Sequence, residues 1–317
     1  MTATVCYFIQ SHRDPPQIYR LVRLLRQGSP RAKILVRHDF DKCALDWAPL
    51  ADLPETFLLP STGPQVRSDF SCQAQPYLDA IAWLERRGIA YDWLVNLTAQ
   101  DYPVQPIAKI ESFLGDAACD GFLRYWDVLS AASPWPERKA RARYWYRYRR
   151  LSPQAEPWLR AARPLTKLLP LHFYLDYGPL FGVRALRTPF HDGFRCHGGW
   201  AWFSLRRSAA TYLRDFLAEN PEVERHYRKT VASEESLVQT VLVNSKHFDL
   251  IDDDLRFIDY SRANKGSPRT LTTADLPELA TGRYHFARKF DLAVDSGVLD
   301  RIDRELLGVE PARVKQK

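Results

Sequence analysis

The chain opens with Val5-Cys6-Tyr7-Phe8-Ile9-Gln10-Ser11-His12-Arg13-Asp14-Pro15-Pro16, in which an apolar run is followed by a polar loop and two prolines. The apolar run predicts a buried strand, and the prolines suit the first turn of a helix. Apolar residues then repeat at helical spacing through residues 18–25, and Gly28-Ser29-Pro30 ends that pattern. The stretch therefore predicts one strand–helix unit of an α/β fold.

The same alternation continues through the first 125 residues. Apolar runs at 34–36, 56–59, 93–97 and 121–125 predict further strands, and residues 77–84 and 107–114 have helical spacing. Alternating strands and helices favour a parallel, doubly wound sheet, in which ligands bind beyond the carboxyl ends of the strands. His12, Asp39 and Asp101 follow three of these strands, so we expect them to line one crevice.

The pattern changes in the middle of the chain. Residues 133–177 are rich in proline, arginine and aromatic residues, and they include a basic-aromatic run from Arg141 to Arg150. A strand around Trp202, helices at 212–217 and 234–244, a strand at 257–260 and a helical tail at 298–307 follow. We expect one α/β domain spanning 1–317, with 133–177 as an insertion or flap.

Composition restricts the class of protein. The 317 residues are 45% hydrophobic and carry a net charge of +7, which indicates a packed globular protein that favours anionic partners. Five scattered cysteines without a CxxC pair indicate neither a zinc cage nor a disulfide framework. The N-terminal residues lack the basic and small-residue features of a signal peptide. We expect a cytoplasmic protein, with the basic-aromatic insertion placing it peripherally at the inner membrane face.

Acidic residues provide two candidate sites. Asp39-Phe40-Asp41 has the spacing with which many sugar transferases hold a divalent cation, although a strand end rich in aspartate produces this pattern by chance. Asp252-Asp253-Asp254 is typical of a solvated turn. Glu234 and Glu235 follow Ser233, so they suit either the first turn of a capped helix or a general base for an acceptor hydroxyl.

Basic residues provide two more candidate sites. Arg288-Lys289 lies between Phe286 and Phe290 and could neutralise a leaving diphosphate, or simply form a basic surface cluster. The Arg141–Arg150 run could stack on bases or sugars, lie at a membrane interface, or form a flap whose arginines are in solvent. A binding module for nucleic acid or an anionic membrane therefore remains an alternative to an enzyme.

Six motifs in order resemble the core-2/I-branching β-1,6-N-acetylglucosaminyltransferase family, which includes peptide O-xylosyltransferases. They are Tyr7-Phe8-Ile9-Gln10-Ser11-His12, Leu35-Val36-Arg37-His38-Asp39, Leu97-Thr98-Ala99-Gln100-Asp101-Tyr102-Pro103, Trp202-Phe203-Ser204-Leu205, Glu235-Ser236-Leu237-Val238-Gln239-Thr240-Val241-Leu242, and Ser267-Pro268-Arg269 followed by Phe286-Ala287-Arg288-Lys289-Phe290. The last is the most specific.

This resemblance implies a GT-A fold and a single-displacement, inverting transfer of GlcNAc or xylose from a UDP-sugar, with no metal or other cofactor and no nucleic-acid partner. Glu235 matches the family's general base, and Lys289 matches the lysine at the donor diphosphate. The donor site would comprise Asp39, Ile9, Asp101, Arg269, Arg256, Arg288 and Lys289. Trp200, Trp202 and Glu234 would contact substrate, although Trp200-Ala201 departs from the family pattern. The alternative is a metal-dependent GT-A enzyme that binds its cation through Asp39 and Asp41.

Overall fold

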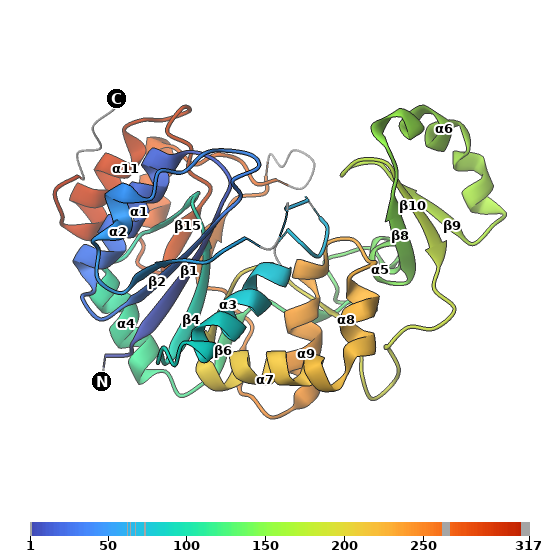
Figure 1. Ribbon diagram of the computed structural model, residues 1–317, viewed down its shortest axis with the longest axis horizontal. Helices are drawn as coiled ribbons and strands as arrows, with labels where there is room; N and C mark the ends of the chain where they lie inside the picture. Colours follow the sequence, from blue (N-terminus) through green and yellow to red (C-terminus); the bar gives the residue numbers. More distant parts are fainter. Residues whose placement is uncertain are drawn as a thin grey trace.

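A seven-stranded sheet forms the centre of the protein. The computed structural model describes residues 2–61, 63, 65–66, 68–72, 74–261 and 267–311. The sheet has the order β13-β6-β12-β4-β1-β2-β3 (Figure 1). Its strands are β1 (Val5–Ser11), β2 (Lys33–His38), β3 (Thr56–Leu58), β4 (Trp93–Thr98), β6 (Gly121–Leu123), β12 (Phe203–Arg206) and β13 (Leu250–Ile251). The predicted α/β fold of GT-A type is confirmed.

One strand departs from the expected parallel arrangement. The pairs β1–β2, β1–β4, β2–β3 and β13–β6 are parallel, whereas β12 runs antiparallel to both β4 and β6. The chain leaves the sheet at the carboxyl end of β6, makes a long excursion and returns at the same edge. Strand β12 therefore re-enters the sheet in the opposite direction.

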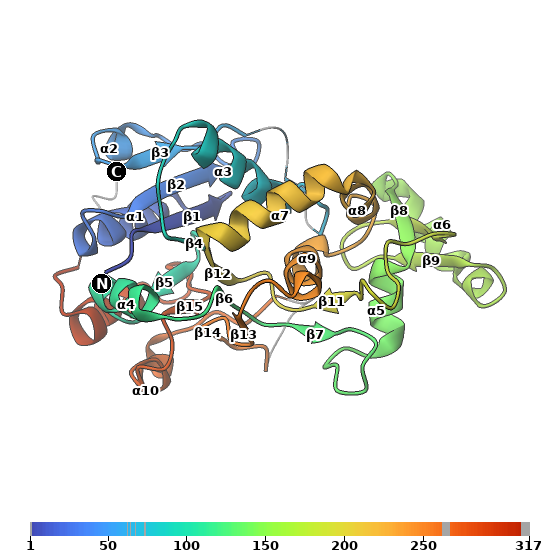
Figure 2. The same cartoon turned by 90° about the horizontal axis from the view of Figure 1, so that it is seen from below.

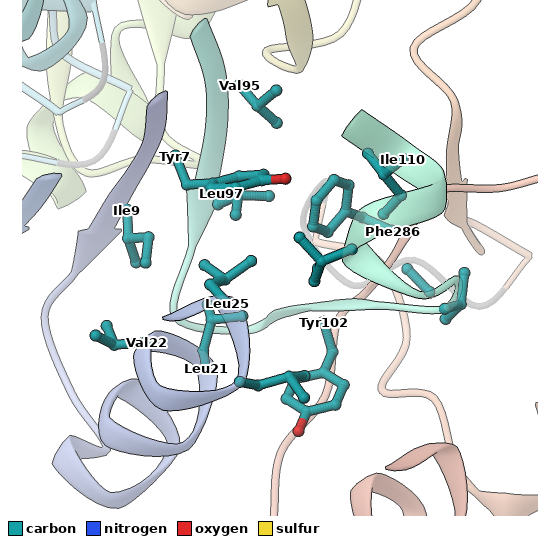
Figure 3. Packing of buried hydrophobic residues seen from close by; sticks show 14 of the residues in the cluster. Tyr7, Ile9, Leu21, Val22, Leu25, Val95, Leu97, Tyr102, Ile110 and Phe286 are labelled. Atoms are coloured by element: carbon teal, nitrogen blue, oxygen red, sulfur yellow. The ribbon is translucent and has the colours of Figure 1, made fainter. Parts of the chain in front are cut away.

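Two apolar cores cover the two faces of this sheet. Alternate residues of β1 enter different cores: Tyr7 and Ile9 join one, and Cys6 and Phe8 join the other, as the period of a strand requires. The first core packs against α1 (Pro15–Gly28), α4 (Ile107–Asp116), α11 (Val298–Arg301) and the π-helix η5 (Ile302–Leu307), and Figure 3 shows part of it. The second packs against α3 (Ala74–Arg86), α7 (Arg207–Glu219) and α9 (Leu237–Ser245), with α7 beside α3 in Figure 2.

Smaller elements surround the large sheet. Strands β14 (Arg256–Ile258), β15 (Phe286–Arg288) and β5 (Asp101–Pro103) form a three-stranded sheet in which Arg288 lies opposite Asp101. Strands β7 (Trp126–Asp127) and β11 (His197–Gly198) pair with each other. The short helices are α2 (Ala48–Ala51), α8 (Pro221–Tyr227), α10 (Leu276–Leu279), η3 (Ser233–Glu235) and η4 (Thr273–Asp275). Within the described residues, no helix is both long and apolar enough to cross a bilayer.

A separate sheet projects to one side of the molecule (Figure 1). It has the order β8-β10-β9, and we call residues 146–187 the arm. The arm contains β8 (Tyr146–Arg150), η1 (Pro153–Ala155), α6 (Glu156–Ala161), η2 (Arg163–Lys167), β9 (Leu171–Tyr174) and β10 (Leu180–Arg184), and α5 (Glu137–Tyr144) precedes it. Most of the arm falls within the predicted insertion at 133–177. The division of the chain into one domain with an insertion stays a prediction.

Candidate active site

Glu235 lies in a short turn and not in the predicted helix at 234–244. The residues Ser233–Glu235 form the 3-10 helix η3, and the α-helix α9 begins only at Leu237. Ser233 forms no capping hydrogen bond with any described residue, so its interpretation as a helix cap is wrong. The buried Ser236 hydroxyl instead donates to the carbonyl oxygen of His197 at 2.7 Å. This contact fixes the turn against β11.

Gly199 brings the neighbouring strand close to the same turn. Its backbone N–H donates to the carbonyl oxygen of Glu235 at 2.8 Å. A Cβ atom at position 199 would lie 1.9 Å from the carbonyl oxygen of Arg124, so only glycine fits this close approach. The hydrogen bonds of Ser236 and Gly199 therefore fix the backbone at Glu235. Its side chain extends from a rigid stretch of backbone.

Arg143 is the partner of the Glu235 carboxylate. Its Nη1 donates to Oε2 of Glu235 at 2.5 Å, and the two side chains are 4% and 26% exposed. Although burial alone lowers the pKa of Arg143, Glu235 and nearby phenols raise it well above its ordinary value, so it stays a cation. Its guanidinium also lies 4.7 Å from the centre of the Trp135 ring. The interpretation that the arginines of 141–150 are all in solvent is therefore wrong for Arg143.

Glu234 has a different environment from its neighbour. Burial first and the charge of Glu235 second raise the pKa of Glu234 to about 8, and its Oε2 has no hydrogen-bond partner among the described residues. A raised pKa keeps this carboxyl protonated at neutral pH, while Glu235 is paired with a guanidinium. The two adjacent carboxyls therefore have different surroundings: Glu235 is held by a cation, and Oε2 of Glu234 has no partner among the described residues.

Aromatic side chains gather near Glu235, and we call Trp126, Trp200, Tyr177 and Tyr260 the aromatic wall. Trp200 stacks on Tyr260 with ring centres 5.2 Å apart, and Trp126 meets the Trp200 ring edge-on at 5.3 Å. The pKa values of Tyr177 and Tyr260 are raised to about 12, mainly by burial, and the charge of Glu235 contributes to both. An apolar wall with phenol hydroxyls is a surface that binds the faces and hydroxyls of sugars.

Trp202 has a supporting position. Its ring is buried, and the Arg288 guanidinium lies over it at 3.8 Å from the ring centre. The guanidinium of Arg256 lies 5.3 Å from the same ring. Trp202 is thus enclosed beneath two arginines, whereas Trp200 lies beside Tyr260 in the aromatic wall.

Asp101 is fully buried and anchors these arginines. Its Oδ2 accepts hydrogen bonds from the backbone N–H and hydroxyl of Thr98, both at 2.5 Å. Its Oδ1 lies 3.5 Å from Nε of Arg288 and 3.6 Å from Nη1 of Arg256. Arg256 is buried and donates to the carbonyl oxygen of Asn96 at 2.6 Å. Because the Asp101 side chain has no exposed surface, it supports the two arginines from beneath, and its place in a common crevice with His12 and Asp39 stays a prediction.

Lys289 and Arg269 have different partners. Lys289 donates from Nζ to the Ser267 hydroxyl at 2.9 Å. Arg269 contacts two carboxylates, Asp259 at 2.5 Å and Asp275 through both terminal nitrogens. Because the guanidinium of Arg269 is paired with two carboxylates of the protein, Arg269 has less uncompensated charge than Arg288.

Asp39 closes the donor end of the predicted site. Its carboxylate accepts from the backbone N–H of Asp41 at 3.2 Å and of Gln65 at 3.4 Å, and Nζ of Lys42 lies 3.2 Å from Oδ2. Burial first and the charge of Lys42 second lower the pKa of His12, and the charge of Asp39 opposes this shift. The carboxyl ends of β1 and β2 therefore bring His12 and Asp39 near each other, as expected.

Two other predicted positions fall elsewhere. The Ile9 side chain is enclosed in the first core beside α1 (Figure 3). Asp254 is buried next to Arg256, and burial raises its pKa to about 6, so the interpretation of 252–254 as a solvated turn is wrong for this residue. Among the residues placed by the structure, no three His, Cys, Asp or Glu side chains are arranged to hold a metal ion.

The sequence of this chain is similar to known glycosyltransferases. A family model described as Core-2/I-Branching enzyme matches residues 53–280. The β-glucuronosyltransferase GlcAT14A of Arabidopsis thaliana is 28% identical over 75% of this chain and 47% of its own length, and GlcAT14C is 30% identical over 73% and 53%. Human xylosyltransferase 1 is 26% identical over 72% of this chain and 22% of its own length.

The chain therefore spans about half the length, or less, of the curated relatives it matches. The family match covers the turn with Glu235, the Arg143 contact and the aromatic wall. The chain belongs to the Core-2/I-Branching enzyme family of glycosyltransferases.

Proposed function

We propose that this glycosyltransferase is an inverting, metal-independent enzyme that moves a sugar from a UDP-sugar to an acceptor hydroxyl. The observation that carries the proposal is the position of Tyr260. Its electrostatic neighbours include both Arg288 and Glu235, so a candidate base and a candidate diphosphate cation both lie near one phenol. An inverting transfer needs these two groups on opposite sides of the anomeric carbon.

The reaction is a single displacement. The acceptor oxygen attacks the anomeric carbon and passes its proton to Glu235. The bond between the anomeric carbon and the diphosphate oxygen breaks, and UDP leaves with the bonding electrons. Arg288 and Lys289 meet the negative charge that develops on the diphosphate, which is the role that a metal ion has in other transferases.

Arg143 acts in this scheme as a positioning residue. It holds one oxygen of the Glu235 carboxylate, and no described residue donates a hydrogen bond to the other oxygen, Oε1. The second oxygen can therefore take the acceptor proton. At the far end of the site, Asp39 would contact the uridine portion of the donor.

Three sugars are candidates for the donor. The family resemblance indicates GlcNAc or xylose, and the names of similar proteins add glucuronic acid. UDP release should be measured with UDP-GlcNAc, UDP-xylose and UDP-glucuronic acid, each with and without EDTA. We expect turnover with one of them, full activity in EDTA, and a product whose anomeric configuration by NMR is opposite to that of the donor.

Other results would support the alternatives. Loss of turnover in EDTA, reproduced by Asp41→Asn, would assign a metal-dependent reaction to Asp39 and Asp41. Retention of the anomeric configuration would refute the single displacement.

A further inference from the structure

The arm exposes an unusual amount of apolar surface. Eleven large hydrophobic side chains are exposed within the described residues, and six of them lie in the arm: Trp158, Leu165, Leu168, Leu169, Val183 and Leu186. Trp158 is 77% exposed and Leu168 is 84% exposed. The other five are scattered singly over the rest of the protein, which is ordinary for a globular surface. A cluster of this kind marks an interaction site.

The same segment carries most of the net charge of the protein. Residues 146–187 contain eight lysines and arginines and two acidic residues, so the arm has a formal charge of +6 in a chain whose total is +7. Glu156 pairs with Arg160, one helical turn away. Arg163, Lys167 and Arg184 form no ion pair with any residue that the structure places. The exposed apolar side chains of α6 and η2 are therefore interleaved with uncompensated cations.

We infer that the arm docks on a membrane surface that contains anionic phospholipid. Trp158 and the leucines of 165–169 would enter the boundary between headgroups and acyl chains, while Arg163 and Lys167 meet the phosphates. This combination of an amphipathic segment with tryptophan, leucine and basic residues is typical of proteins that lie on a bilayer.

The charge disfavours a second copy of the chain on this surface, and the aliphatic side chains disfavour a nucleic acid. A second copy of the chain would bring two arms of like charge together, which opposes association. A single-stranded nucleic acid needs flat aromatic platforms for its bases, whereas Leu165, Leu168 and Leu169 are aliphatic. An anionic bilayer satisfies both the charge and the aliphatic surface.

A cavity at the base of the arm extends the cationic surface. It has a volume of about 470 Å³, and its lining residues are Arg147, Arg187, Glu222, Arg225, His226 and Lys229. Its four cations form no ion pair within the described part of the chain. His226 is buried, and its Nε2 donates to the carbonyl oxygen of Tyr144 at 2.9 Å. Its Nδ1 is then a buried acceptor without a partner among the described residues.

The test is co-sedimentation of the full chain with lipid vesicles. Vesicles of phosphatidylglycerol mixed with phosphatidylcholine are compared with phosphatidylcholine alone, at low and high salt. We expect binding to the mixed vesicles that weakens with salt. The double variant Trp158→Ser/Leu168→Ser should bind at least about tenfold more weakly, because each side chain loses its apolar contact with lipid.

A matched control removes exposed apolar surface elsewhere. Leu129→Ser/Val294→Ser should bind vesicles as the unmodified protein does, and both double variants should melt as it does. Arg163→Gln/Lys167→Gln should weaken binding and reduce its dependence on salt.

Three outcomes would overturn the inference. They are absence of binding to the mixed vesicles, binding that the Trp158→Ser/Leu168→Ser variant leaves unchanged, and a dimer in analytical ultracentrifugation that this variant dissociates. The last outcome would assign the surface to a second copy of the chain.

Discussion

Replacing Glu234 with glutamine tests the electrostatics beside the proposed base. Burial raises the pKa of Glu234 to about 8 from an ordinary value of 4.5, and the charges of Glu235 and Asp69 act in the same direction. Arg143 opposes the shift but is occupied by Glu235. Tyr77 and Cys72 also lie within the electrostatic reach of this carboxyl. The folded protein therefore keeps a proton on Glu234 that the unfolded chain releases.

The sign and size of the effect follow from this difference. Below about pH 4.5 both states hold the proton, and between about pH 4.5 and 8 only the native state does, so stability falls as pH rises through this window. A difference of about 3.5 pKa units corresponds to about 5 kcal/mol at most. Because the residue is only partly buried, we expect about half of this, roughly 2–3 kcal/mol.

Urea denaturation of the unmodified protein and of Glu234→Gln measures the effect directly. Glutamine keeps the shape but does not titrate, so the variant should gain roughly 2–3 kcal/mol over the unmodified protein between about pH 5 and about pH 9, with no further gain above that. Glu222→Gln, at an exposed glutamate, serves as a control, and its stability relative to the unmodified protein should not change with pH. A difference between the two proteins that stays constant with pH would refute the reasoning.

Three further changes have defined outcomes. Arg143→Met should lower kcat/KM about 100-fold and move the acidic limb of the pH–rate profile to higher pH, with partial recovery in Arg143→Lys; an unchanged pH profile would argue against a positioning role. Gly199→Ala should destabilise the protein by about 3 kcal/mol in a denaturant titration, because its Cβ meets the Arg124 carbonyl oxygen, whereas Gly297→Ala should have little effect. Asp39→Asn should raise KM for the UDP-sugar about tenfold with kcat unchanged, and a fall in kcat alone would place Asp39 in the chemical step.

Local patterns in the sequence were sufficient for the first half of the fold. Each strand of the β1–β4 region is a short apolar run bounded by polar residues, and the longer helices α1 and α3 repeat apolar residues on one face, whereas the single turn α2 has no such pattern and was not predicted. The direction of β12 could not be predicted in this way. It depends on where the chain returns after the arm, which is a property of the long excursion and not of residues 203–206.

The site shows the same division between local and long-range information. The motif around Glu235 located the acid, but Arg143 is 92 positions away in a run of similar arginines, so nothing local distinguishes it from its neighbours. Tyr260 likewise has no motif of its own. Arg269 did carry a local signal, because Asp259 and Asp275 lie 10 and 6 positions away and bind it in the structure.

The measurement that tests the central claim most directly is UDP release by Glu235→Gln with the best donor and acceptor. Glutamine retains the size of the side chain and an oxygen for Arg143, but it cannot accept the acceptor proton. We expect turnover to fall by at least about 100-fold, with donor binding and the melting temperature retained, while Glu137→Gln, an exposed acid on α5, keeps full activity. Full turnover by Glu235→Gln would contradict the assignment of Glu235 as the base.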